Sequence, residues 1–521
     1  MLQRLFEDVL ALGGTSEEPF DPAIARLKLK LADHGRCLRN DAASDPALNP
    51  QVMDDLFARG LFSLTVPCAF GGLEASLHDF VACMETVGEM GAAYAMTAVP
   101  HLCISVKSIA QLCEADTARE VLGRIRTHKR LVSFAITEDN GSDVAAITTR
   151  LTRAGDGTLR LCGRKLWITN LSRADHVVVV ARCPDLHPVP GATVLVRVGT
   201  QQRGVTIGTP WHKYCTNGSD TSDLYFDAVE IAPEQLMGAP GKGLGLFHDM
   251  VQPGRLGAAA ACVGMARGAL TAAMADPQTP LSGQDIQPLT SAINVSSATV
   301  ALTARLGDQA HADFAALVAL AKHAASCQAQ SVVSAVDLAY ARLGRAAPAT
   351  VAHATQAIGL LRLLKGPGDI IAMQTVATWL ARHETMSAHP KWPLALRAAT
   401  TTLAQALQAL GERGGPSADP AGMLDLAELC ATGWMLTAAV TAGTSITTHC
   451  KPADTRWAWQ RFSKQARQVK QSVHPSSRDI AQAYAALETS RATGRLIPTE
   501  LVDAPWIFPA SSGIPSSALA A

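Results

Sequence analysis

The stretch that decides the fold is FAITEDNGSD, residues 134–143, read together with GRKLWITN, residues 163–170. The first supplies the hydroxyl of Thr137 and a Gly-Ser turn at Gly141 and Ser142. Exposed backbone N–H groups in such a turn suit a phosphate or a ring oxygen. A Gly-Ser-Asp turn is common on its own, so this stretch predicts a ligand site only in combination with the second one.

The second stretch carries an indole and a hydroxyl two residues apart, Trp167 and Thr169. In a β-strand both side chains point to the same face, so both can lie against one flat ring system. A tryptophan on a strand is also a common core residue. The order and spacing of the two stretches, continued by further motifs downstream, favour a binding site over a core strand.

Composition limits the class of protein. A chain of 521 residues is too long for one ordinary core, and two to four structural units are expected. The 45 basic and 45 acidic residues balance, which argues against nucleic acid as the main partner. A hydrophobic content of 48% with only 5% aromatic residues indicates tightly packed helices.

Hydrophobic periodicity changes along the chain. Apolar residues recur at helical spacing before residue 130 and return to it after about residue 241. Between these regions lie short alternating or β-branched runs, and Gly155-Asp156-Gly157 is predicted to join the first two runs as a hairpin. We therefore expect a mainly α protein with a central β unit, an antiparallel barrel or sandwich. The predicted segments are an N-terminal helical domain (1–130), a middle β domain (131–240), a C-terminal helical bundle (241–390), an extra helical domain (391–497) and a Pro/Ser/Ala-rich tail (498–521).

Several other classes are disfavoured. The first residues, MLQRLFEDVLAL, do not resemble a signal peptide, and Arg267 interrupts the best candidate for a membrane span. The twelve cysteines form no CxxC pair and no histidine cluster has metal-ligand spacing. We expect reduced thiols, no metal and a cytoplasmic location.

The two stretches resemble the flavin-binding motifs of the acyl-CoA dehydrogenase family. The resemblance covers about residues 50–390, and the region beyond is similar to the extra helical domain of the larger members. Two downstream segments extend it: KYCTNGSDTSDLYFDAVEIAP (213–233), and MGAPGKGLGLFHDMVQPGRLGAAAACVGMARGAL (237–270), which resembles the Gly-rich turn into the helix that runs beside the substrate. Arg255 stands in the place of that helix's arginine.

The segment QAIGLL (356–361) resembles the family's Gln-x-x-Gly motif, which touches the adenine end of a neighbouring subunit's FAD; AVDLAY (335–340) is an alternative match. Gln356 is preferred because this segment keeps both the glutamine and a glycine, and because its distance to the next motif agrees with the family spacing. The resemblance implies a homodimer or homotetramer. It also implies FAD contacts from Phe134, Ile136, Thr137, Gly141, Ser142, Trp167, Thr169, Gln356 and Gly359.

The next motif, WLARHETMS (379–387), holds the catalytic base that the resemblance implies. Glu384 lies 384 − 356 = 28 residues after Gln356, close to the family spacing. Removing an α-proton beside a thioester requires a desolvated carboxylate with a raised pKa. Some relatives place the base beside the helix arginine, but that neighbour here is Gly254, and His383 is the nearest substitute for Glu384. Arg255 and Glu384 are the expected catalytic residues.

Some positions depart from the family pattern. The first motif has Asp139-Asn140 and is one residue shorter than usual, and the segment 275–287 lacks the arginine and phenylalanine that grip the FAD pyrophosphate. Two function classes stay open. One is FAD-dependent dehydrogenation of an acyl thioester, on CoA or on an acyl carrier protein, with a flavoprotein or oxygen as electron acceptor. The other is the same fold used as a flavin monooxygenase, a non-redox enzyme or a binding protein.

Overall fold

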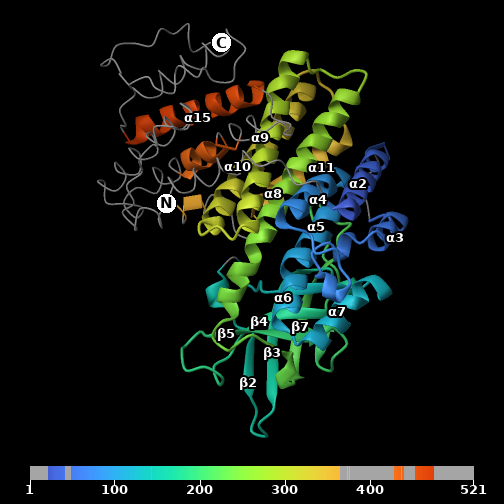
Figure 1. Ribbon diagram of the computed structural model, residues 1–521, viewed down its shortest axis with the longest axis vertical. Coiled ribbons are helices and arrows are strands. Elements are labelled where there is room, and N and C mark those ends of the chain that lie inside the picture. The colour runs from blue at the N-terminus through green and yellow to red at the C-terminus, as the bar shows by residue number, and fades with distance from the viewer. Residues whose placement is uncertain are drawn as a thin grey trace.

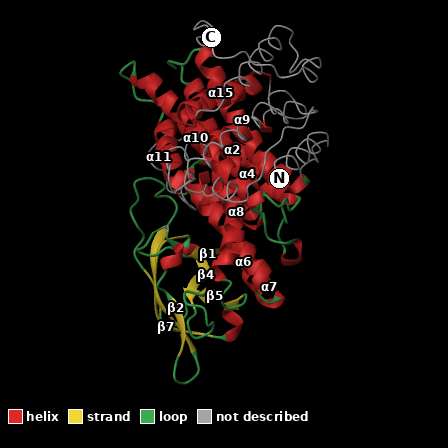
Figure 2. Ribbon diagram, turned by 90° about the vertical axis from the view of Figure 1, so that its left-hand side faces the viewer, coloured by secondary structure: helices red, strands yellow, loops and turns green. Residues whose placement is uncertain are grey.

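The protein is described here from a computed structural model. The described residues are 21–40, 48–141, 143–363, 372–373, 375, 427–435, 437–438 and 452–473. Helices gather at one end of the molecule and strands at the other, and one long helix, α8, runs from the strands into the bundle (Figures 1 and 2). The predicted fold class, helices followed by a β unit and more helices, is confirmed.

The N-terminal part is helical, as the periodicity predicted. Side chains cap α3 and α4: Asn49 accepts from Gln51 N and Val52 N, and Ser76 accepts from Asp79 N. The helices are α2 (Pro22–Asn40), α3 (Pro50–Ala58), α4 (Leu77–Met90), α5 (Ala92–Pro100), α6 (Val106–Leu112) and α7 (Ala115–His128).

The described strands form one eight-stranded sheet in the order β6-β7-β3-β2-β4-β5-β8, with β1 beside β4. The predicted hairpin is confirmed, since β2 and β3 pair antiparallel and Ala154 N donates to Thr158 O (2.8 Å). The strands are β1 (Leu131–Ala135), β2 (Arg150–Arg153), β3 (Leu159–Thr169), β4 (Ala174–Arg182), β5 (Thr193–Gly199), β6 (Val205–Ile207), β7 (Thr221–Ile231) and β8 (Leu236–Met237).

One expectation about this sheet is wrong. Antiparallel neighbours were predicted, but β1 pairs with β4 in parallel, and so does β2 at Arg150. Between β1 and β4 the chain passes through the whole β2–β3 hairpin, which leaves enough chain for a parallel crossover. The sheet is therefore mixed, and β1 is placed where its exit meets β3.

The C-terminal helices pack around α8. They are α8 (Gly243–Ala275), α9 (Gly283–Asp308), α10 (Phe314–Ala341), α11 (Ala349–Leu363) and α15 (Pro452–Val473). The α4 and α8 backbones approach so closely that a Cβ at Gly264 would lie 1.8 Å from Glu85 O. By length and composition α8 is apolar enough to cross a membrane, yet 72% of its most apolar window is buried inside the protein.

A chain of polar contacts ties four helices together. Arg267 on α8 donates to Glu85 on α4 (2.5 Å), whose other oxygen accepts from Ser297 on α9 (2.7 Å). Asn294 on α9 lies next to Arg267 and also donates to buried Asp454 on α15 (3.3 Å). The charged groups of these contacts, Arg267, Glu85 and Asp454, each have a partner of opposite charge or a hydrogen-bond donor, as buried charges require.

A buried histidine joins the helical part to the sheet. His101, directly after α5, is fully buried; its Nδ1 accepts from Val132 N (3.1 Å) and its Nε2 lies 3.0 Å from Phe62 O. The neutral ring with its proton on Nε2 satisfies both contacts. Burial lowers the pKa of His101 to about 4, despite its backbone hydrogen bonds. Protonation would turn Nδ1 from the acceptor of the Val132 N–H into a donor, for which Val132 O lies 3.3 Å away.

We expect stability to fall as the pH drops from about 6.5 to about 4. The folded pKa of His101 lies below its ordinary value, so the unfolded chain takes up the proton first and the contribution is complete only above pH 6.5. Thermal unfolding across this range tests it. In His101→Gln the decline should be smaller, and an unchanged decline would assign it to other groups, among them His78, whose pKa burial also lowers to about 4.

Candidate functional site

The two motifs meet at the exit of β1. Thr137 follows β1 by two residues, and its backbone oxygen accepts from Leu166 N of β3 (2.8 Å). Phe134 and Ile136 are partly buried against the helical core, and the ring of Phe134 stacks on Phe247 of α8 (5.5 Å between centroids). The structure thus brings together motifs that are separated in sequence and sets them beside the start of α8.

Trp167 has an unusual backbone. Its φ is +59°, and the pairing of β3 with β7 is irregular between Lys165 and Ile168. A bulky residue rarely adopts positive φ, so the surrounding contacts must hold it there. The indole is 50% exposed and stacks on Trp211 (4.7 Å between centroids, 25° between planes), whereas neighbouring Ile168 is buried. Trp167 therefore presents aromatic surface to solvent.

Thr169 is partly buried at the end of β3, and its backbone oxygen accepts from Ser133 Oγ of β1 (2.8 Å). The next residue, Asn170, donates through Nδ2 to Thr97 O of α5 (2.9 Å). The side-chain oxygens of the same two residues, Asn170 Oδ1 and Thr97 Oγ1, take no part in this bond. Both are buried and lack a hydrogen-bond partner among the described residues. Such unsatisfied oxygens mark a place where a ligand could donate hydrogen bonds.

The turn of the first motif is open. Gly141 has a φ of +60°, is exposed, and would place a Cβ in free space. Its N–H donates to Glu138 O (3.0 Å), and the side chain of Asn140 donates to Asp143 O. Ser142 lies outside the described residues. The shortened motif still forms a compact turn beside Thr137.

Sequence reasoning missed a buried ion pair behind these motifs. Lys165 is fully buried, and its Nζ donates to Glu138 Oε1 (2.8 Å) and to Ile136 O (3.0 Å). Burial alone would raise the pKa of Glu138, but hydrogen bonds from Lys165, Thr148 and Thr149 outweigh it and lower that pKa to about 2. Burial lowers the pKa of Lys165 to about 8, against the attraction of Glu138. Both groups are charged at neutral pH.

Arg255 lies on α8, two turns after Phe247. It is partly buried, and its Nη1 donates to Gln252 Oε1 (3.2 Å). Burial lowers the pKa of Arg255 from its ordinary value. Gly254 beside it is buried. Glu384 and His383, the expected base and its substitute, lie outside the described residues.

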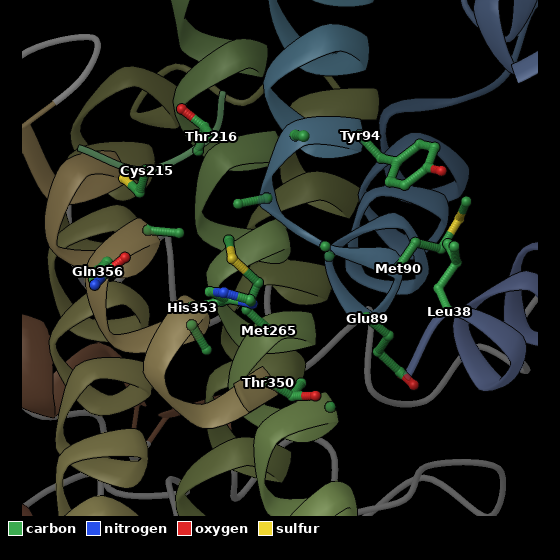
Figure 3. Close-up of a pocket in the computed structure, with 17 residues that line it drawn as sticks. Leu38, Glu89, Met90, Tyr94, Cys215, Thr216, Met265, Thr350, His353 and Gln356 are labelled. Atoms are coloured by element: carbon green, nitrogen blue, oxygen red, sulfur yellow. The ribbon is translucent and has the colours of Figure 1, made fainter. Parts of the chain in front are cut away.

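A cavity of about 90 Å³ lies where α5 begins, between α8 and α11 (Figure 3). Its lining includes Tyr94, Met265, His353 and Gln356, and Thr216 reaches it from the loop before β7. Thr216 has a φ of +62°, and its buried hydroxyl lacks a hydrogen-bond partner among the described residues. Gln356 thus borders a partly polar cavity, while Gly359 lies one turn further along α11.

A larger groove of about 670 Å³ lies on the β unit, between residues 146–150 and the loop 184–192. Arg150, Arg182 and His187 line it, so its polar side chains favour an anion. Thr148 lines the groove as well and donates to Glu138 Oε2 (2.6 Å). The groove therefore adjoins the turn of the first motif.

Two family models match the chain. The N-terminal domain of acyl-CoA dehydrogenase matches residues 32–129, and the middle domain of acyl-CoA dehydrogenase matches residues 133–229. The first range covers the N-terminal helices and the second contains both motifs of the site.

Similar proteins carry related names. The chain is 31% identical over 248 residues to the very long-chain specific acyl-CoA dehydrogenase of Macaca fascicularis, covering 45% of this chain and 38% of that protein. It is 29% identical to the caffeyl-CoA reductase-Etf complex subunit CarC of Acetobacterium woodii, covering 43% and 59%. In both cases the match spans less than two thirds of the relative's length.

A solved acyl-CoA dehydrogenase from Bacillus anthracis, complexed with FAD, has the same fold, with a TM-score of 0.74 at 17% identity over 91% of this chain and 92% of that one. The chain is thus similar to acyl-CoA dehydrogenases over residues 32–129 and 133–229, and the second of these ranges contains the paired motifs of the site.

Proposed function

We propose that this protein dehydrogenates an acyl thioester between its α and β carbons with FAD as cofactor. The observation that carries the proposal is the hydrogen bond between Leu166 N and Thr137 O (2.8 Å), which joins the two motifs into one site. The solved relative from Bacillus anthracis contains FAD, and the curated relatives act on acyl-CoA compounds by name, which supports the same chemistry here.

The described residues fit the isoalloxazine half of FAD. A half-exposed indole at Trp167 offers a wall, and the turn at Gly141 leaves free space beside its backbone. Asn170, the residue after Thr169, and Thr97, which it contacts, carry the unsatisfied oxygens. The residues assigned to this half are Phe134, Ile136, Thr137, Gly141, Ser142, Trp167 and Thr169. Bound FAD supplies a two-electron acceptor for the hydride of the β-carbon. Gln356 and Gly359 are assigned to the adenine end of a neighbouring subunit's FAD, which makes the protein a homodimer or homotetramer.

The residues of this chain handle the proton. Glu384 is assigned as the base that removes the α-proton, a role that requires a desolvated carboxylate. Arg255 is assigned to the same end of the site, since it is partly buried on α8, two turns after the Phe247 that stacks on Phe134 of β1. A buried guanidinium helps to fix the position of a carboxylate or of a bound thioester.

The groove lined by Arg150, Arg182 and His187 is assigned to the phosphate-bearing carrier of the acyl group, CoA or an acyl carrier protein. The groove adjoins the motif turn, because Thr148 lines it and donates to Glu138. The reoxidant is an electron-transferring flavoprotein or oxygen; one relative is named as part of an Etf complex. We place the protein in the cytoplasm.

Replacing Trp167 with Ala should raise the dissociation constant of FAD about 100-fold, because loss of an aromatic wall removes on the order of 3 kcal/mol. Equilibrium dialysis or flavin fluorescence measures it. Tyr214→Ala is the matched control, since this aromatic is 83% exposed on the neighbouring loop and outside the proposed contact set. Equal flavin affinity in Trp167→Ala and wild type would remove Trp167 from the cofactor site.

Glu384→Gln keeps the shape of the side chain but not its basicity. Flavin and thioester should still bind, while reduction of the flavin by substrate should slow by about 10²–10⁴-fold or more. Anaerobic stopped-flow absorbance measures the rate. Reduction at the wild-type rate would place the base elsewhere, with His383 the first residue to replace.

The function as a whole is tested by anaerobic titration of the purified protein with a panel of acyl thioesters. A yellow protein that one thioester bleaches supports dehydrogenation. A yellow protein that none bleaches favours a monooxygenase, and a colourless protein that cannot be reconstituted favours a non-redox or binding role.

A further inference from the structure

The ion pair of Lys165 and Glu138 lies directly behind the residues assigned to the flavin, and nothing in the proposed chemistry uses it. We propose that this pair is a positioning device: it fixes Thr137, in the segment that follows β1, and Trp167, on β3, in the arrangement that binds the cofactor. The inference rests on the proposed function, because it concerns the same flavin site. Neither charged group is itself assigned a contact with the flavin.

Three consecutive residues after β1 are fixed by β3. Lys165 Nζ donates to Ile136 O (3.0 Å), Leu166 N donates to Thr137 O (2.8 Å), and Lys165 Nζ also donates to the carboxylate of Glu138 (2.8 Å). The residues on both sides of Thr137 are therefore bound to one buried ammonium. Because charge-assisted hydrogen bonds in a dry site are the stronger kind, the path of this segment is set by Lys165.

The same lysine anchors the strained segment of β3. Trp167 has a φ of +59°, and the ladder to β7 resumes only at Ile168, opposite Ser222. The irregular stretch is thus held at its start by the buried ion pair and at its end by the sheet. A bulky residue seldom adopts a positive φ, so this conformation persists only when contacts on both sides of the residue hold it in place.

Glu138 extends the clamp to the far end of the motif turn. Its Oε2 accepts from Thr148 N (2.5 Å) and Thr148 Oγ1 (2.6 Å), and its Oε1 accepts from Thr149 N (3.0 Å). Glu138 precedes the turn that contains Gly141, and Thr148 and Thr149, which follow the turn, donate to its carboxylate. One ion pair closes the turn, aligns Thr137 and holds the strand that carries Trp167.

The chain offers a matched control one residue away. Arg164 pairs with Asp139 (2.5 Å), so the neighbouring residues of both motifs form a second ion pair. That pair is 44% and 76% exposed, whereas Lys165 and Glu138 are 0% and 4% exposed. An exposed pair of this kind contributes little, so its loss should leave the site in place.

The experiment compares Lys165→Met, the double variant Lys165→Met with Glu138→Gln, and Arg164→Met. The double variant removes both buried charges, so it folds even if the single variant, with an unpaired carboxylate, does not. We expect the FAD dissociation constant to rise about 10- to 100-fold in the double variant, by analogy with the loss of metal affinity when residues that orient metal ligands are removed. Arg164→Met should change it less than about threefold.

Two further readouts separate positioning from stability. Thermal unfolding of each apo-protein establishes that affinities are measured on folded protein, and near-UV circular dichroism reports the stacked Trp167–Trp211 pair. We expect an altered tryptophan signal together with weaker binding. A lower melting temperature with unchanged FAD affinity and an unchanged tryptophan signal would overturn the inference and leave the pair a purely structural role. If the wild-type protein binds no FAD, the proposed function is wrong, and the inference that rests on it is wrong as well.

Discussion

The site depends on one constraint, which is that the segment leaving β1 is bonded to β3 at successive residues. The backbone bond from Leu166 to Thr137 is one part of it and the buried ammonium of Lys165 is the other. Without these bonds the two motifs would be a turn and a strand with no common ligand. Burying the lysine without a partner would be expensive, so Glu138 and its threonine donors are part of the same unit. The parallel pairing of β1 with β4 places the β1 exit where this contact can form.

The helical part contacts β1 through helix α8. Phe134 stacks on Phe247 at the start of α8, so the flavin motifs and the helix carrying Arg255 are fixed relative to each other by aromatic packing. Further along α8 the small cavity beside Gln356 and the contacts of Arg267 belong to the helix bundle. The contact between Phe134 and Phe247 therefore lies at the junction between the sheet and the bundle, which α8 connects (Figure 1).

Local patterns in the sequence were sufficient for the order of helices and strands and for the β2–β3 hairpin, because periodicity and turn residues are properties of neighbouring positions. The parallel pairing of β1 was not predictable in this way, since it joins segments separated by a hairpin. The same holds for the stack of Trp167 on Trp211 and for the pair of Lys165 with Glu138, which are long-range contacts. A lysine and a glutamate within two polar-looking motifs gave no sign of being buried. The assignment of Glu384 remains a prediction, because this residue lies outside the described part of the chain.

The central claim is that the two motifs form one face of a flavin site, and a crystal structure of the protein reconstituted with FAD tests it most directly. We expect electron density for the isoalloxazine ring against the indole of Trp167, within contact distance of Thr137 and Thr169, with the Lys165–Glu138 pair intact behind it. Ring density elsewhere on the protein, with Trp167 still stacked only on Trp211 and open to solvent, would contradict it.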